Sequence, residues 1–157
     1  MGAAQRVDRV ITRGEFTLDG QSFTVDNNVW LVGDDSEVLV VDAAHDPSVI
    51  EAAIGGRRVS LIVATHGHND HINAAGELAD KVGAPIALHP DDTMLWEVVY
   101  PARRPDRALA DGQEIPLPGG GTLRVLHTPG HSPGGVCLFG EIGGEPVLFS
   151  GDTLFRG

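Results

Sequence analysis

An apolar run that leads straight into a group of histidines most strongly constrains the fold. Residues 61–64 read Leu-Ile-Val-Ala, as expected of a strand covered on both faces. Residues 65–71 follow at once and read Thr-His-Gly-His-Asn-Asp-His. From Ile72 to Val82, apolar residues recur with the spacing of one helical face, and Gly83 comes directly after them. The sequence therefore predicts a strand, a histidine-rich loop and a helix in direct succession.

The rest of the chain alternates short strand patterns with turns and two further helices. Asp46-Pro47 resembles a helix N-cap followed by proline, and Gly55 is placed to end that helix. A short helix is expected at residues 92–100, before a polar connection. Strands at both ends with helices between them favour an α/β fold with two sheets, in one domain over residues 1–157. Further strands are expected at residues 15–18, 22–25, 29–32, 38–41, 85–88, 114–117, 122–126, 136–139 and 147–149.

The histidine loop has the pattern of a metal site. His66 and His68 are two residues apart where the chain leaves a strand, so both side chains can point toward one metal ion. Gly67 between them lets the backbone bend. Asp70 and His71 follow at the expected start of the helix, aimed at a neighbouring point. We therefore expect a metal site here, with more ligand-type side chains beside it.

Two later segments also end strands in ligand-type residues. A Thr-Pro-Gly turn precedes His131, and Ser-Gly precedes Asp152. Side chains that follow strands in this way can converge on one edge of the fold. A solvated polar loop is the alternative, because short motif matches carry false positives, but three separate segments argue against it. A structural role is expected for the other histidines, His45, His89 and His127.

The motif resembles that of the metallo-β-lactamase superfamily, His-x-His-x-Asp-His with a later His and a later Asp. Residues 128–135 and 150–155 look most like the glyoxalase II-type thioesterase branch. The resemblance implies an αββα sandwich with two divalent metal ions, most typically zinc, with iron or manganese as alternatives. The implied ligands are His66, His68 and His131 for one ion, Asp70 and His71 for the other, and Asp152 as a bridge.

The resemblance also implies two residues that support the ligands. Asp42, at the end of the strand expected at 38–41, resembles an aspartate that holds the histidine loop, with turn capping as the alternative. Thr65, the first residue of the motif, is the second supporting residue. Both would act through the ligands and not on the metal.

The implied function is a metal-dependent hydrolase that acts on a small-molecule thioester or ester. Two metal ions would lower the pKa of a bridging water toward about 7, and the resulting hydroxide would attack the carbonyl. Asp70 would orient the water. Such a mechanism needs no side-chain nucleophile. A β-lactamase is disfavoured, because Asp152 stands where the lactamase branches resembled have Cys or Ser.

Three alternatives remain open at this point. One is a lactonase. Another is a persulfide dioxygenase with a single iron, for which the implied ligands are His66, His131 and Asp152. The third is a non-catalytic metal-binding domain. Family members continue past residues 151–155 into elements that bring another histidine to the second metal, whereas this sequence ends at Gly157. We therefore expect that the C-terminal segment of the family is missing.

Charge and composition limit the partners. The chain has 11 basic and 22 acidic residues and a net charge of −11, which disfavours nucleic acid and anionic membranes. Its single cysteine, Cys137, excludes an internal disulfide and is expected to pack in the core. No stretch approaches 18 apolar residues, and residues 1–16 lack the apolar part of a signal peptide. We expect a cytoplasmic protein without a membrane span.

Overall fold

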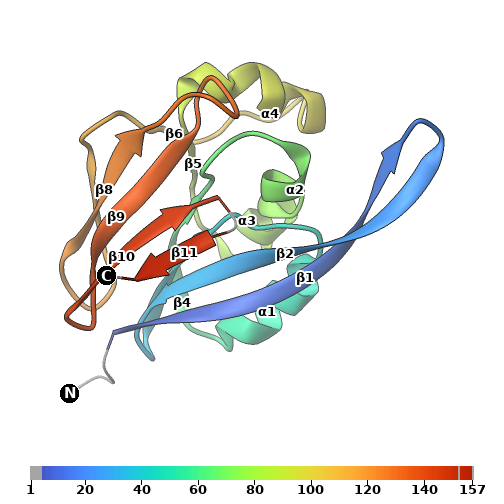
Figure 1. The fold of residues 1–157 in the computed structure, drawn as a ribbon. Coiled ribbons are helices and arrows are strands. Elements are labelled where there is room, and N and C mark those ends of the chain that lie inside the picture. The colour runs from blue at the N-terminus through green and yellow to red at the C-terminus, as the bar shows by residue number, and fades with distance from the viewer. Residues whose placement is uncertain (1–4, 152, 157) are drawn as a thin grey trace.

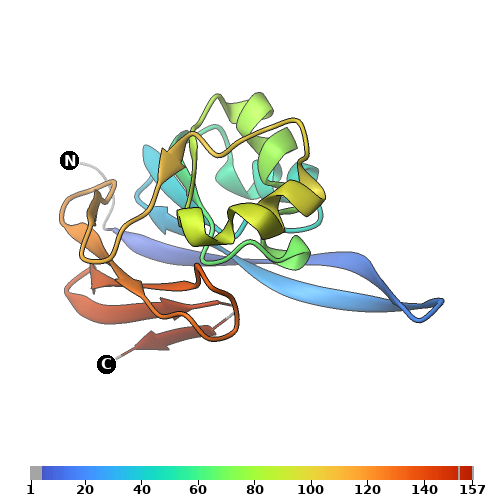
Figure 2. The same cartoon turned by 90° about the horizontal axis from the view of Figure 1, so that it is seen from above.

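Two β-sheets packed face to face form the body of the molecule (Figure 1), of which the computed structural model describes residues 5–151 and 153–156. Figure 2 shows the helices gathered over one of the two sheets. The described layers therefore run helix, sheet, sheet, and the expected α/β class with two sheets is confirmed.

The first sheet has six strands, β1 to β6, which lie in sequence order across the sheet. Their bounds are Arg6–Leu18, Gln21–Gly33, Glu37–Val41, Arg58–Val63, Ile86–Leu88 and Arg107–Ala108. The pairs β1–β2 and β2–β3 are antiparallel, and β3 to β6 run parallel. The parallel strands therefore end at the same edge of the sheet.

The second sheet is antiparallel throughout, in the order β11-β10-β9-β8-β7. From β7 to β11, the strands are Glu114–Pro116, Thr122–His127, Val136–Ile142, Glu145–Ser150 and Thr153–Arg156. The loop between β8 and β9 carries His131, and the turn after β10 leads toward Asp152.

Helical segments form the connections between the parallel strands, since such strands need crossovers. The helices α1 to α4 are Pro47–Ile54, Asn69–Ile72, Ala75–Val82 and Thr93–Val99, with a 3₁₀ turn at Pro90–Asp92 before the last. The ends of α1 are as predicted. The Asp46 carboxylate accepts hydrogen bonds from the backbone N–H groups of Ser48 and Val49, and Gly55 ends the helix in a left-handed conformation.

β3 is buried on both faces and divides the core in two. Val38 and Val40 pack in a cluster with the helices, whereas Leu39 and Val41 pack in a cluster with the second sheet. All four side chains are 0% exposed. Because side chains alternate along a strand, a strand between two apolar layers is apolar at every position. The first sheet is thus fixed between the helices and the second sheet.

The structure differs from the prediction in several places. The strands expected at 22–25 and 29–32 are one strand, β2, which pairs with β1 along its whole length in a long hairpin that projects beyond the body (Figure 1). The helix expected at 72–82 is broken into α2 and α3. The strands β6 and β11 were not predicted. Cys137 is partly exposed and not a core residue, because side chains alternate along β9 and its neighbours Val136 and Leu138 are the ones that face the core.

No helix among the described residues is long and apolar enough to cross a membrane. A cytoplasmic location, a single domain over residues 1–157 and the lack of nucleic-acid and membrane partners stay predictions.

Truncation of Val41 tests the core between the sheets. We expect Val41→Ala to lower the free energy of unfolding by about 2 kcal/mol, because it removes buried methyl groups and leaves a cavity. The matched control is Val98→Ala on α4, where the side chain is 81% exposed and the change should stay within about 0.5 kcal/mol. Urea denaturation measures both. Equal losses in the two variants would contradict the assignment of this core.

Candidate metal centre

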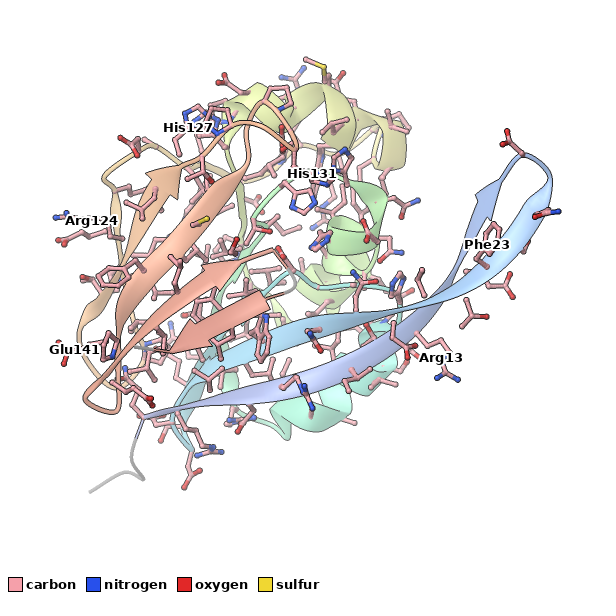
Figure 3. All side chains as sticks on the ribbon, viewed as in Figure 1. Arg13, Phe23, Arg124, His127, His131 and Glu141 are labelled. Atoms are coloured by element: carbon pink, nitrogen blue, oxygen red, sulfur yellow. The ribbon has the colours of Figure 1, made fainter. Side chains whose placement is uncertain are left out.

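Three predicted ligands meet at the ends of strands from the two sheets. His66 and His68 follow β4, and His131 lies in the loop between β8 and β9 (Figure 3). Their ring centres are 5.0 Å apart for His66 and His68, 4.6 Å for His68 and His131, and 5.1 Å for His66 and His131. One nitrogen of each ring lies within 4.8 Å of the others. This spacing suits three ligands of a single metal ion.

A second group of ligand atoms lies beside the first. Asp70 and His71 are in α2, directly after the histidine loop, and one ligand atom from each lies within 4.8 Å of one from His66. The His71 Nε2 atom is 3.6 Å from the Asp70 Oδ2 atom. The structure therefore brings together all the predicted ligands that it describes, in two adjoining groups.

Asp42 and Thr65 determine which nitrogen of two ligands carries hydrogen. The buried Asp42 carboxylate accepts from the Thr65 backbone N–H and from its hydroxyl, both at 2.7 Å, and from His71 Nδ1 at 2.9 Å. Since the only hydroxyl hydrogen of Thr65 points to Asp42, its oxygen accepts from His66 Nδ1, 3.1 Å away. Both imidazoles therefore present the Nε2 lone pair on the side away from Asp42.

Two nitrogens of the site are buried without a hydrogen-bond partner in the described chain. They are His66 Nε2 and His68 Nδ1. An unpaired buried polar atom costs about 1–3 kcal/mol, so it calls for a partner. Burial, together with the neighbouring histidines, lowers the pKa of His66 to about 4, which leaves the ring neutral at pH 7. The neutral, unpaired imidazole of His66 fits a divalent metal ion, because no proton has to leave before it binds.

Asp70 is ionised at the edge of the same site. Its side chain is 44% exposed. Partial burial raises the pKa of Asp70, but the neighbouring His71 and a hydrogen bond of 3.2 Å from the side-chain amide of Asn27 outweigh that effect, so the pKa lies below its ordinary value. The carboxylate is therefore charged at neutral pH, as a metal ligand must be.

Asp92 joins the two ligand loops, a role that no sequence pattern indicated. Its fully buried carboxylate accepts from the Gly67 N–H and the Ser132 hydroxyl at 2.8 Å each, and from the Gly134 N–H at 2.6 Å. A Cβ atom at Gly134 would collide with Asp92, so glycine is needed there. One buried charge thus fixes the His66–His68 loop relative to the His131 loop.

Asp152 lies outside the described residues, so its role as a bridging ligand stays a prediction. Its neighbours Ser150 and Gly151 line a pocket of about 240 Å³ together with His66 and His131. The turn after β10 therefore reaches the same site.

A larger pocket of about 440 Å³ opens on the other side of the ligands. It reaches from the metal ligands to the β1–β2 hairpin, which contributes Glu15 and Val25. The other residues that line it are His45, His68, Asn69, Asp70, Asn73 and His131. His45, for which a structural role is expected, thus lines the same pocket as Asp70, and that expectation stays a prediction.

The remaining histidines form a separate pair. The rings of His89 and His127 stack with their centres 4.1 Å apart and an angle of 13° between their planes, and Asp91 lies beside them. His127 Nε2 lies 2.9 Å from the Pro133 carbonyl, and His89 Nδ1 accepts from the Asp91 N–H. In-plane lone pairs of parallel rings do not converge on one ion. These bonds support the expected structural role.

A two-sheet sandwich with histidines and carboxylates gathered at its strand ends defines a metal-binding α/β fold. The family model of the metallo-β-lactamase superfamily matches residues 23–157, and this chain belongs to that superfamily. Its fold implies binding of divalent metal, and the unpaired imidazole nitrogens fit that expectation.

Relatives with curated descriptions match most of this chain. A hydroxyacylglutathione hydrolase of Acidiphilium cryptum (strain JF-5) is 39% identical over 149 residues, which cover 92% of this chain and 56% of that protein. A hydroxyacylglutathione hydrolase of Pseudomonas putida (strain W619) is 35% identical over 135 residues, with 83% and 48% covered. The crystal structure of TTHA1623 in a di-iron-bound form has a TM-score of 0.63 at 28% identity, with 80% and 65% covered. The chain spans about half the length of these curated relatives.

Replacement of Asp92 tests the link between the two ligand loops. We expect Asp92→Asn to lower the free energy of unfolding by on the order of 3 kcal/mol, because an amide has one acceptor oxygen and would direct its NH₂ group at a buried donor. Asp91→Asn is the control, since this carboxylate is 57% exposed and its loss should cost less than about 0.5 kcal/mol. Denaturation of the metal-free proteins measures the difference. If both variants were equally stable, Asp92 would not hold the loops together.

Proposed function

We propose that this chain carries the catalytic metal centre of a hydrolase that cleaves a small-molecule thioester or ester. The observation that carries the proposal is the pair of buried, unpaired nitrogens, His66 Nε2 and His68 Nδ1, beside His131. Two relatives named hydroxyacylglutathione hydrolases favour a thioester over other substrates.

The proposed ligands divide into two sets. His66, His68 and His131 would hold one divalent ion, and Asp70 and His71 would hold a second, with Asp152 proposed as the bridge. Zinc is the metal we propose, and iron or manganese would suit the same nitrogen and oxygen donors. When bound, the ions supply Lewis acidity and lower the pKa of a water molecule toward about 7.

The protein itself supplies orientation and charge. Asp42 keeps Nδ1–H of His71 turned away from the site, so that Nε2 faces it. The ionised Asp70 can accept a hydrogen bond from the attacking water and so orient it toward a carbonyl carbon. The pocket of about 440 Å³ lies directly against Asp70 and is the proposed position of the substrate. Val25 on the hairpin would contact an apolar part of it.

Metal content tests the site first. We expect about two zinc, iron or manganese ions per chain, and a clear decrease in His131→Ala, because the variant lacks one of three nitrogens that hold the first ion. Elemental analysis of the purified proteins measures both, with His127→Ala as a matched control outside the site. A single iron per chain would instead favour the persulfide dioxygenase, and metal no higher than in His131→Ala would refute the proposed centre.

Asp70→Ala tests the hydrolytic role. We expect the turnover of a hydroxyacylglutathione thioester by this variant to fall at least about 100-fold. The second metal ion would lose a ligand, and the attacking water would lose its hydrogen-bond acceptor. Release of free thiol measures the rate. Asp91→Ala, which removes a carboxylate beside His89 and His127, should hydrolyse the thioester as fast as the original protein. Near-normal turnover by Asp70→Ala would rule out the assigned role.

A further inference from the structure

A chain of hydrogen bonds leads from the loop after β3 to the Asp70 carboxylate. The series begins at His45, whose backbone is in the left-handed conformation with φ 65°. A side chain at Gly14, in β1, would collide with the His45 imidazole, so glycine there makes room for the ring against the hairpin. The ring therefore occupies a place that the glycine in β1 leaves open for it.

Asn73 fixes which His45 nitrogen carries hydrogen. The backbone N–H of His45 can only donate, and it donates to Asn73 Oδ1. The other end of this amide, Asn73 Nδ2, therefore faces His45 Nδ1, 3.0 Å away, and can only donate to it. Nδ1 of the ring must be an acceptor, so the hydrogen of the neutral imidazole lies on Nε2.

The same polarity continues to Asp70. His45 Nε2–H lies 2.7 Å from Asn27 Oδ1 and donates to it, which turns Asn27 Nδ2 toward Asp70 Oδ2 at 3.2 Å. Asn27 is only 4% exposed, so water cannot readily take the place of either partner. The backbone N–H group of His45 thus sets the direction of every hydrogen bond in this series.

We propose that His45 is a positioning residue for Asp70, acting through Asn27. The Nε2–H group of His45 holds the Asn27 amide in the one orientation that donates to the carboxylate, and this bond sets the rotation of the carboxylate beside His71. The role rests on the proposed function only in that Asp70 and His71 hold the second ion. In this role His45 acts through Asn27 and is not itself a metal ligand.

The test compares His45→Leu with His45→Gln. Leucine removes the donor, whereas the glutamine Nε2 amide lies close to the place of the imidazole Nε2 and can still donate to Asn27. Competition with a chelator measures the zinc affinity of each of the two sites. We expect His45→Leu to weaken the second site by about 10- to 100-fold and to leave the first unchanged. His45→Gln should restore the second site to within a few-fold, and His127→Gln should change neither.

Two measurements on the metal-free protein keep this inference separate from the proposed function. The ring ¹⁵N shifts of His45 should show hydrogen on Nε2, and the side-chain amide signals of Asn27 should shift in His45→Leu and recover in His45→Gln. Hydrogen on Nδ1, unchanged Asn27 signals, or a glutamine variant as weak as leucine would overturn the positioning role. If the original protein binds no second ion, the two-metal function fails, and the Asn27 signals alone decide the role of His45.

Discussion

Burial of two carboxylates in the interior is the constraint on which the site depends. Asp42 and Asp92 are both 0% exposed, and a buried charge is costly unless donors surround it. Asp42 accepts hydrogen bonds from Thr65 and His71. Asp92 accepts them from the two loops that carry the ligands, one at His66–His68 and the other at His131. The loops that carry the ligands therefore close on these charges when the chain folds, and the ligand nitrogens are oriented before a metal binds.

The sheet topology explains why these groups meet. β3, β4 and β5 are parallel neighbours, so their carboxyl ends lie at one edge of the first sheet. Asp42 follows β3, the histidine loop follows β4, and Asp92 follows β5 within four residues. The second sheet packs across β3 and places the loop before β9 above the same edge. Distant residues such as Gly67 and Asp92, or His66 and His131, thus meet because three parallel strands end together and the second sheet brings its loop to the same edge.

Features with local signals could be predicted from the sequence, and features defined by distant partners could not. The Asp46 cap and Gly55 are set by neighbours a few residues away, and the structure has them as predicted. The histidine loop was predicted from its local motif, although the bonds that hold it come from Asp42 and Asp92. The strand β2 was divided because polar residues at 26–28 interrupt its apolar pattern, yet pairing with β1 carries it through. Asp92 gave no signal, since its donors come from residues 25 to 42 positions away. The predicted helix is broken at Ala74 for a similar reason, because the backbone N–H of Ala74 donates to the distant Ala43 carbonyl.

The buried, unpaired imidazole nitrogens lower the stability of the metal-free protein. His66 Nε2 and His68 Nδ1 stay unpaired at about 1–3 kcal/mol each, in a domain whose total stability is about 5–15 kcal/mol. The six hydrogen bonds to Asp42 and Asp92 hold the loops in this arrangement despite that cost. Metal binding would relieve the unpaired nitrogens without moving the loops. Affinity for the ion and stability of the fold are therefore linked through the same two buried carboxylates, and a change at either one alters both.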